Sequence, residues 1–383
     1  MEPAALSLCL KDRARELGFS MLGIAPAEPA PHLAAYLRWI RAGMHGTMAY
    51  LARPDRVVRR EDLNVILPGA RSLVIAALDY YTLRLPDEIV ADPSRGRISN
   101  YAWGADYHDV MLPRLEALVG FLAAEAGRPV AARAYVDTGA ILERSHAARA
   151  GLGFIGKNTM LIHPRRGSFF FLGEIITDLE LTCDDPALVP MPGCGTCTRC
   201  LTACPTGAFP EPYVLDARLC ISYLTIEHKG FIPRRLRPLM GNWVYGCDVC
   251  QDICPWQRFA RSTWEEAFQP FDYDRAAPPL SALLTLDEEA FAQRFGGTPI
   301  YRIRRPRLVR NACIAAGNSG LPELADCLIP LLEDESPLVR GHAGWALGRL
   351  GVGRGQLAAR LAVETDATVR GEIAAALEML SAA

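Results

Sequence analysis

The sequence lacks the long apolar segments that would place a protein in or across a membrane. The chain of 383 residues contains no uncharged apolar run of the roughly 18 residues that a transmembrane helix needs. Its opening stretch, MEPAALSLCLKDRARELG, also lacks the apolar core of a secretion signal. We therefore expect a cytoplasmic protein without a membrane partner, in which cysteines stay reduced instead of forming disulfides.

A strong net charge and the common nucleotide motifs are missing as well. The formal net charge is −2, so a nucleic-acid partner would have to be held by local basic patches. There is no Walker sequence and no haem-type Cys-x-x-Cys-His. Gly151-Leu-Gly-Phe-Ile-Gly156 matches the dinucleotide fingerprint in letters, but residues 141–150 before it read as helix and 157–162 after it as strand. That order is the reverse of the fingerprint's, and we expect the glycines to end a helix.

Cysteine is abundant instead, with 12 in the chain. Most of them fall in two spaced runs, each followed directly by proline. The first run matches the bacterial ferredoxin pattern, in which three cysteines hold one [4Fe–4S] cluster and the fourth holds the other. The runs are Cys194-x2-Cys197-x2-Cys200-x3-Cys204-Pro205 and Cys247-x2-Cys250-x3-Cys254-Pro255.

The second run is one cysteine short, because Val244 stands where the first would be, and Cys220 between the runs is the natural substitute. Zinc ribbons are the alternative, yet zinc explains neither the cysteine triplet nor the two prolines. Cysteines 9, 183, 313 and 327 lie outside the pattern and are expected to be small buried side chains. Crossing over the last cysteine of each run predicts two ligand sets: Cys194, Cys197, Cys200 and Cys254 for one cluster, and Cys204, Cys220, Cys247 and Cys250 for the other.

Before the cysteines, helical and strand patterns alternate. Strands are predicted at 20–24, 71–78 and 134–136, and a long helix at 109–127. This alternation predicts an α/β (α+β) domain. The whole chain then divides into this domain at 1–183, a ferredoxin-like two-cluster domain at 184–265, a linker at 266–300 and α-helical HEAT-like repeats at 301–383.

The tail is repetitive. Val309-Arg310, Val339-Arg340 and Val369-Arg370 recur every thirty residues, each ahead of an alanine-rich stretch, which predicts a short helical solenoid. Because this small number of repeats buries little surface by itself, we expect the repeats to pack on the rest of the chain. Two basic stretches, 229–237 and 302–310, make a nucleic-acid surface plausible, and an ordinary solvated helix face is the alternative.

Several motifs together resemble the epoxyqueuosine reductase family over nearly the whole chain. The resemblance implies an enzyme that carries cobalamin and two [4Fe–4S] clusters. It would reduce epoxyqueuosine to queuosine at the wobble position of tRNA, the last step of queuosine biosynthesis. The motifs are the cysteine array, Val136-Asp-Thr-Gly139, Gly153-Phe-Ile-Gly-Lys-Asn-Thr-Met-Leu-Ile162, Phe171-Leu-Gly-Glu174 and Ser222-Tyr-Leu-Thr-Ile-Glu227.

The resemblance also implies residue roles. Asp137 matches the family's proton donor, although an Asp that only caps its own turn is the alternative. Cobalamin should bind base-off, because the corrinoid motif begun by Asp106-Tyr-His108 meets Met111 where it needs glycine. The corrinoid pocket would be lined by Arg60, Asn100, Asp137, Lys157, Asn158, Thr159, Lys229, Cys247 and Asp248.

The tRNA is expected to meet the chain between the two cysteine runs, with the modified base splayed out of the anticodon loop. A flavodoxin or ferredoxin would supply electrons, and we expect a monomer. A corrinoid reductive dehalogenase is the competing enzyme, but those usually carry a twin-arginine signal and lack a helical tail. A ferredoxin-like carrier would leave the first domain without a purpose. The implied tRNA contacts are Ser222, Tyr223, Leu224, Thr225, Ile226, Glu227, His228, Lys229 and Phe231.

Overall fold

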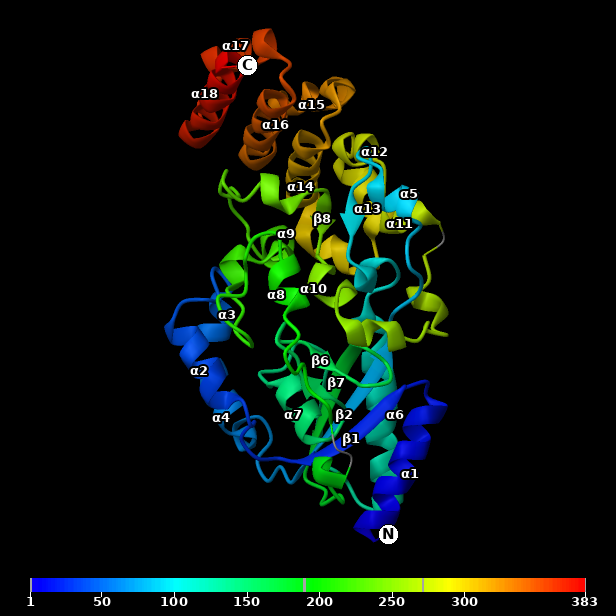
Figure 1. The fold of residues 1–383 in the computed structure, drawn as a ribbon. Coiled ribbons are helices and arrows are strands. Elements are labelled where there is room, and N and C mark those ends of the chain that lie inside the picture. The colour runs from blue at the N-terminus through cyan, green and yellow to red at the C-terminus, as the bar shows by residue number, and fades with distance from the viewer. Residues whose placement is uncertain (1, 189–190, 271, 383) are drawn as a thin grey trace. The chain divides into compact units, whose positions relative to one another are not determined.

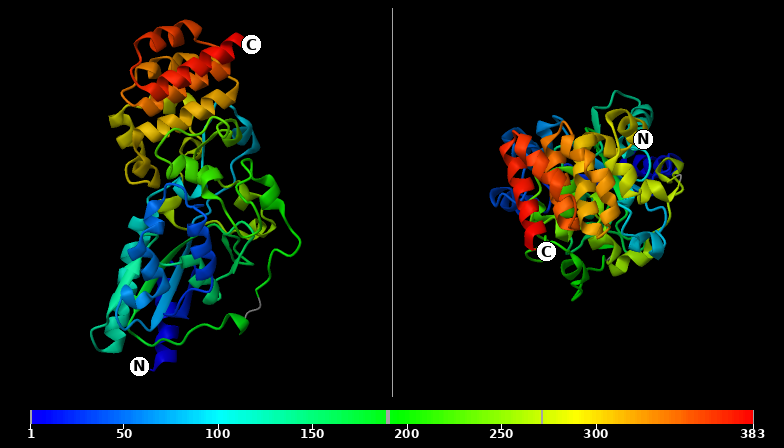
Figure 2. Two further views of the ribbon diagram at one scale, coloured as in Figure 1. Left: turned by 90° about the vertical axis from the view of Figure 1, so that its left-hand side faces the viewer. Right: turned by 90° about the horizontal axis from the view of Figure 1, so that it is seen from above.

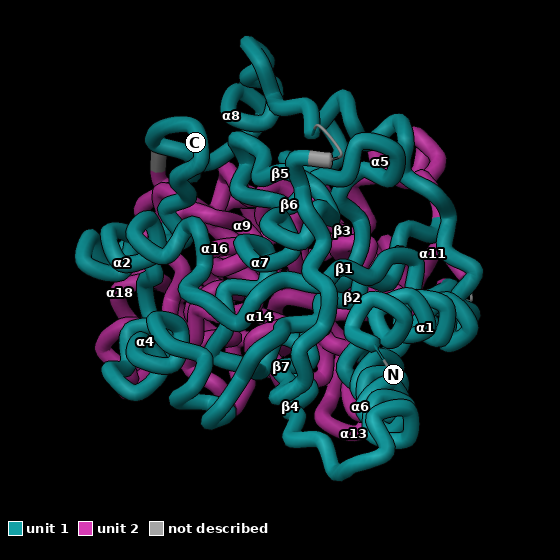
Figure 3. Tube along the Cα trace, turned by 90° about the horizontal axis from the view of Figure 1, so that it is seen from below, with its two compact units in different colours: residues 1–82, 105–218, 249–269 teal, residues 83–104, 219–248, 270–383 magenta. Residues whose placement is uncertain are grey.

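The computed structural model describes residues 2–188, 191–270 and 272–382, and the chain forms two compact units, each assembled from separate stretches (Figure 1; Figure 3). Unit 1 comprises residues 1–82, 105–218 and 249–269, and unit 2 comprises residues 83–104, 219–248 and 270–383. Within the described ranges, no helix combines the length and apolar character needed to cross a bilayer.

Unit 1 is built on a four-stranded antiparallel sheet in the order β1-β2-β7-β4. Every residue of β2 is buried, because this strand lies between two others and both faces of the sheet are covered. The strands are β1 (Met21–Pro26), β2 (Ser72–Asp79), β4 (Ala132–Tyr135) and β7 (Phe170–Thr177), with a small pair β5 (Phe154–Ile155) and β6 (Leu161–Ile162). The helices are α1 (Pro3–Glu16), α2 (Leu33–Arg41), α3 (Ala49–Ala52), α4 (Pro54–Glu61), α6 (Tyr107–Ala126), α7 (Glu143–Arg149), α8 (Arg199–Ala203) and α10 (Val249–Asp252).

The two faces of β7 serve different helices, because successive side chains of a strand point to opposite sides. On one face Phe171 stacks on Tyr107 of α6, with ring centroids 4.2 Å apart. Gly173 lies on the same face, where an added Cβ would come within 2.8 Å of the Leu115 side chain. The other face belongs to an apolar core that includes Phe170 and Ile176. Helix α7 contributes to that core, and it appears on the opposite side of the strands from α6 in Figure 1.

Most local predictions for unit 1 are confirmed. The strands expected at 20–24 and 71–78 and the helix at 109–127 are present, with the helix capped by Asp106 and ended by Gly127 in the left-handed conformation. The strand expected at 157–162 is wrong except for its last two residues. A tight turn replaces it, with the Gly156 N–H donating to the Met160 carbonyl over 2.8 Å.

The rejected dinucleotide motif is indeed not a nucleotide loop. Helix α7 ends directly before it, and Gly151 has the positive φ of 73° that ends helices. Its next glycine, Gly153, passes so close to the Ile162 carbonyl that an added Cβ would lie 2.6 Å away. These glycines therefore serve chain packing.

Unit 2 ends in the helical repeats that the period of thirty predicted. Three long helices, α14 (Arg304–Ser319), α16 (Pro337–Leu350) and α18 (Ala367–Ala382), lie side by side (Figure 2). The recurring valines are buried in all three, which accounts for the repeat. The other elements are α5 (Asp87–Ala91), β3 (Arg97–Ile98), α9 (Ile221–Ile226), β8 (Trp243–Tyr245), α11 (Tyr273–Ala276), α12 (Leu280–Leu284), α13 (Glu288–Phe295), α15 (Ala325–Leu328) and α17 (Arg354–Val363).

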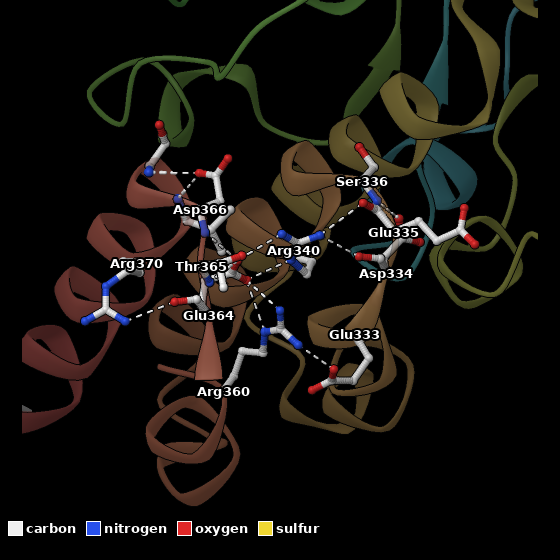
Figure 4. Close-up of polar contacts among 12 residues, drawn as sticks. Glu333, Asp334, Glu335, Ser336, Arg340, Arg360, Glu364, Thr365, Asp366 and Arg370 are labelled. Carbon is white, nitrogen blue, oxygen red and sulfur yellow. Dashed lines mark hydrogen bonds and ion pairs between the residues drawn. The ribbon is translucent and has the colours of Figure 1, made fainter. Parts of the chain in front are cut away.

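The recurring arginines are structural. Arg340 donates to the Asp334 and Glu335 carbonyls over 2.9 and 3.1 Å, just ahead of its own helix. It also forms a two-pronged pair with Glu364, with N···O distances of 2.8 and 2.9 Å (Figure 4). Hydrogen bonds from Arg340 hold the pKa of the Glu364 carboxyl at about 2. Arg370 likewise donates to the Glu364 carbonyl over 3.0 Å. In both repeats, the arginine therefore holds the backbone just ahead of its own helix.

Arg310, the first of these arginines, clamps a different element. It is fully buried and donates to the carbonyls of Leu224, His228 and Gly230 over 2.9, 2.6 and 2.9 Å. These carbonyls lie at and after the end of α9, whose backbone acceptors have no further helical partner. Arg310 thus ties α9 to the repeat stack.

The expectation of two basic surface stretches is therefore wrong in part. In the stretch 302–310, Arg310 is buried and donates its hydrogen bonds to backbone carbonyls. In the stretch 229–237, Arg237 is 1% exposed and forms an ion pair with Glu372, with N···O distances of 2.8 and 2.9 Å. The side chains of Lys229 and Arg235 remain exposed.

Candidate redox site and its proton donors

The first predicted cysteine set is gathered within unit 1. Helix α8 carries Cys200 and packs against α10, which leads to Cys254. Burial raises the pKa of Cys200, and the neighbouring Cys194 and Cys254 raise it further. The pKa of Cys254 is raised in the same way by burial, with Cys194 and Cys197 adding to it. These effects place the four cysteines in one part of unit 1, and their ligation of a single cluster stays a prediction.

Backbone N–H groups already face some of the predicted ligand sulfurs. The N–H of Lys157 donates to the Cys194 sulfur over 3.3 Å, and the N–H of Ala208 donates to the Cys204 sulfur over 3.3 Å. Such hydrogen bonds stabilise negative charge on a thiolate and tune a cluster's reduction potential. Of the second predicted set, Cys204 and Cys250 belong to unit 1, and Cys220 and Cys247 to unit 2.

Two residues assigned to the corrinoid pocket, Lys157 and Asn158, donate hydrogen bonds to the cysteine loops in the structure. The Lys157 ammonium donates to the carbonyls of Gly195 and Cys197 over 2.8 and 2.9 Å. The buried Asn158 amide donates to the Cys250 carbonyl over 3.1 Å. Thr159 has a φ of 65° and closes the turn between these contacts. The turn therefore holds loops of both cysteine runs, and a contact of its residues with cobalamin stays a prediction.

Asp137 is presented at the end of β4 in a strained turn. Its φ is 57°, a left-handed value that is uncommon for residues other than glycine and costs on the order of 1 kcal/mol. Its side chain is exposed, and the Tyr107 hydroxyl donates to its Oδ2 over 3.0 Å. This carboxylate thus bonds a side chain of α6 and does not act only as a cap of its own turn.

The charge of Asp137 acts on two further carboxylates, Glu174 and Glu143, which the sequence analysis did not single out. Glu174 in β7 is fully buried, and neither carboxylate oxygen has a hydrogen-bond partner among the described residues. Burial raises its pKa well above the usual value, and Glu143 and Asp137 raise it further. Burial, with Asp137 as the next cause, raises the pKa of Glu143 to about 8. The sequence signal that could have identified Glu174 is that it is the only charged residue in the otherwise largely apolar strand β7.

Because Glu174 binds its proton more tightly in the folded chain than in the unfolded one, it makes stability fall as pH rises above the unfolded pKa of about 4.3. Glu174→Gln removes this dependence while keeping size and neutrality. We expect the free energy of unfolding of the variant, relative to that of the unmodified chain, to rise between pH 5 and pH 8 by up to about 1.4 kcal/mol per pH unit. Thermal unfolding at several pH values would show this as a growing difference between the two midpoints. A constant difference across that range would mean that Glu174 is ionised in the fold.

Asn100 and Asp248, both assigned to the corrinoid pocket, come together in unit 2. Asp248 is buried and accepts hydrogen bonds from the Ser99 hydroxyl and, over 2.7 Å, from the Asn100 N–H. Burial raises the pKa of Asp248. The Asn100 amide oxygen is buried without a partner among the described residues. It suits a hydrogen-bond donor such as an amide side chain of a corrin ring.

The other residues named for the pocket and for tRNA have mixed surroundings. Arg60 is buried in unit 1, with its guanidinium 5.3 Å from the Tyr36 ring centre. His108 bonds Asp106 through Nδ1 over 2.8 Å. In unit 2 the side chains of Tyr223, Leu224 and Thr225 are buried, so direct side-chain contact with RNA is not supported for them. Ser222, Ile226, Glu227, His228 and Phe231 are half-buried, with Phe231 stacked on His342 at 5.3 Å, and Lys229 is exposed.

Comparisons with known proteins agree with this architecture. An epoxyqueuosine reductase from Pseudomonas aeruginosa is 43% identical over 363 residues, covering 91% of this chain and 96% of the relative. The chain belongs to the epoxyqueuosine reductase family. A family model described as "Epoxyqueuosine reductase QueG, DUF1730" matches residues 60–138. The Escherichia coli epoxyqueuosine reductase is 40% identical, covering 89% of this chain and 88% of that protein.

Two further family models match later parts of the chain. A 4Fe-4S double cluster binding domain matches residues 193–257, which confirms iron–sulfur clusters over zinc. HEAT repeats match residues 303–378, which confirms the helical tail. Membership of this family also excludes the two alternative functions, a reductive dehalogenase and a simple electron carrier.

Solved structures of epoxyqueuosine reductases share the fold. One, determined with an epoxyqueuosine-modified tRNA-Tyr stem loop, has a TM-score of 0.90 at 33% identity and covers 98% of this chain and 99% of its own. Another, from Bacillus subtilis, has a TM-score of 0.88 at 32% identity with the same shares covered. It was captured with its catalytic aspartate loop swung out of the active site.

Proposed function

We propose that this chain reduces epoxyqueuosine in tRNA to queuosine. The observation that carries the proposal is the exposed Asp137 carboxylate, held by Tyr107 in the same unit as the cysteine loops around Cys194 and Cys254. An acid and an electron relay are the two things that reductive opening of an epoxide requires. The relative solved with an epoxyqueuosine-modified stem loop supports the substrate.

The electron and proton balance defines what the residues must do. Converting an epoxide to an alkene breaks two C–O bonds, consumes two electrons and two protons, and releases the oxygen as water. Asp137 donates a proton to the departing oxygen, and Tyr107 orients the carboxylate. Asp137 lies in the turn that follows β4, two residues beyond the last paired residue of that strand, with a left-handed φ of 57°.

Cobalamin is part of the proposal. Bound base-off, it would supply a low-potential cobalt centre able to act as nucleophile or electron donor. Asn100 offers an unpartnered amide oxygen for it, next to the Asp248 carboxylate. Arg60, Asp137, Lys157, Asn158, Thr159, Lys229 and Cys247 complete the proposed set.

Electrons would reach the site through the two clusters, one at a time, from a flavodoxin or ferredoxin. We keep the two ligand sets as predicted from the spacing, and the division at 183, 265 and 300 as the functional division of the chain. For the tRNA, the exposed Lys229 and the half-buried Ser222 and Glu227 are the side chains best able to meet the anticodon loop. Arg310 supports these contacts indirectly, by holding the carbonyls that follow α9.

Nucleoside analysis of tRNA from cells lacking the gene tests the function directly. We expect epoxyqueuosine to accumulate and queuosine to disappear. The intact gene should restore queuosine, and a gene encoding Asp137→Asn should not. Normal queuosine in the deletion strain would refute the proposal.

A further inference from the structure

We propose that Glu174, buried in β7, and the half-buried Glu143 form a proton store that reloads Asp137 between the two protonation steps of the reaction. The inference rests on the proposed function. It assigns a task to two carboxylates that the proton donor itself leaves unexplained.

Strand geometry directs Glu174 toward α7. Glu174 alternates with Gly173 and Ile175, and Gly173 faces α6, so Glu174 faces the opposite side. Its cross-strand partners are Ile75 on β2 and Tyr135 on β4. Both belong to or pack against the apolar core that α7 covers. Glu174 is therefore a carboxylic acid inserted into an otherwise apolar layer.

Glu143 links this acid to Asp137. It is the first residue of α7, and burial together with the charge of the nearby Asp137 raises its pKa. One turn further along α7, Ala147 lies in the same apolar core, so the Glu143 face of the helix is the face turned to the sheet. The order Asp137, Glu143, Glu174 thus runs from the exposed turn into the core.

The charges around the pair favour a shared proton. The groups that face it are Asp137 on the turn, Arg144 on α7, Arg60 on α4 and Tyr135 on β4. Arg144 donates to the Thr159 carbonyl over 2.6 Å, so it is not devoted to the carboxylates. A buried carboxylate without a partner is costly and is avoided by binding a proton. Burial, with the charges of Glu143 and Asp137 added, disfavours ionisation of Glu174, which has no partner among the described residues and therefore keeps its proton.

The stoichiometry gives the store its purpose. Each turnover needs two protons at the same oxygen, and Asp137 carries one. After the first transfer Asp137 is an anion, and the oxygen has become a hydroxyl that must be protonated again to leave as water. A proton passed from Glu143 to Asp137, and replaced in Glu143 from Glu174, supplies this second proton while the bound substrate covers the otherwise exposed Asp137. The electrons come from the cluster relay, so the balance closes.

Glu143→Gln and Glu174→Gln test the store, with Glu116→Gln as the matched control, because Glu116 is an exposed residue of α6. The first measurement needs no turnover. Infrared difference spectra of the resting holoprotein between pH 6 and pH 9 should show the carbonyl band of a protonated carboxylic acid that disappears as pH rises through about 8. The band should weaken in both variants and persist in the control.

The second measurement is turnover of an epoxyqueuosine stem loop with a chemical reductant, normalised to cobalt. We expect Glu143→Gln to lower the rate at pH 7 by about tenfold, less than loss of a direct acid would. The decline of the unmodified enzyme above pH 8 should vanish in this variant. Glu143→Asp, which keeps an acid, should recover part of the rate, and this conservative variant also covers the case in which the Gln variant folds poorly.

Each outcome decides the proposal. Turnover and pH profile unchanged in both Gln variants would overturn the store, even with the infrared band present, since the two acids would then be structural only. A band insensitive to both substitutions would overturn it as well. If the unmodified enzyme fails to convert epoxyqueuosine while the band titrates as expected, the proposed function fails separately.

Discussion

Asp137→Asn is expected to lower product formation by roughly a hundredfold or more, the usual scale of a lost general acid. Asn has nearly the same size and tolerates the left-handed conformation of this turn, so the fold should survive. It can also keep the hydrogen bond from the Tyr107 hydroxyl, since its amide retains an acceptor oxygen. What it loses is the acidic proton.

Single-turnover conversion with prereduced enzyme, normalised to cobalt, is the measurement. Iron content, cobalamin content and tRNA affinity should match those of the unmodified chain. Asp12→Asn, on the exposed surface of α1, is a control that should change none of these. Near-normal turnover in the Asp137 variant would transfer the role of proton donor to Tyr107 or His108.

Cys254→Ser should abolish turnover by removing the cluster that Cys194, Cys197 and Cys200 begin. The ferredoxin pattern assigns the last cysteine of one run to the other run's cluster, and in unit 1 Cys254 adds to the raised pKa of Cys200, while Cys194 and Cys197 add to that of Cys254. Iron content should fall to about half, with the remaining EPR signal coming from the second cluster.

Cys204→Ser should give the reciprocal result, with the cluster of Cys194 retained. Cys183→Ser is the control, because Cys183 is an exposed thiol and not the small buried side chain that the sequence suggested. If Cys204→Ser instead removes the cluster of Cys194, each run serves its own cluster and the crossover is wrong.

Features with a short-range cause could be predicted from the sequence. An iron–sulfur cluster requires certain cysteine spacings, because a short loop must bring several sulfurs to one site. The cysteine array at 194–204 therefore predicts a cluster from the sequence alone. The buried strand at 71–78 and the period of thirty in the tail were equally readable, since strand and helix repeats impose their own periods.

Features that depend on distant neighbours could not be predicted. Arg310 and Arg237 belong to basic stretches that look like nucleic-acid surfaces, yet folding buries both against carbonyls and carboxylates from other parts of unit 2. The strand expected at 157–162 became a turn because Lys157 and Asn158 bond cysteine loops far along the chain.

The sequence by itself determined the iron–sulfur chemistry and the helical-repeat tail, because ligand spacing and repeat period are properties of short stretches of chain. The tertiary structure alone decided which charges are available. Asp137, Glu143 and Glu174 lie on a turn, a helix and a strand, and only the folded sheet of unit 1 brings their carboxylates close enough for one to raise the pKa of another. Electrostatic coupling between carboxylates depends on their distance and burial, and both are set by the folded structure and cannot be derived from the order of residues in the chain.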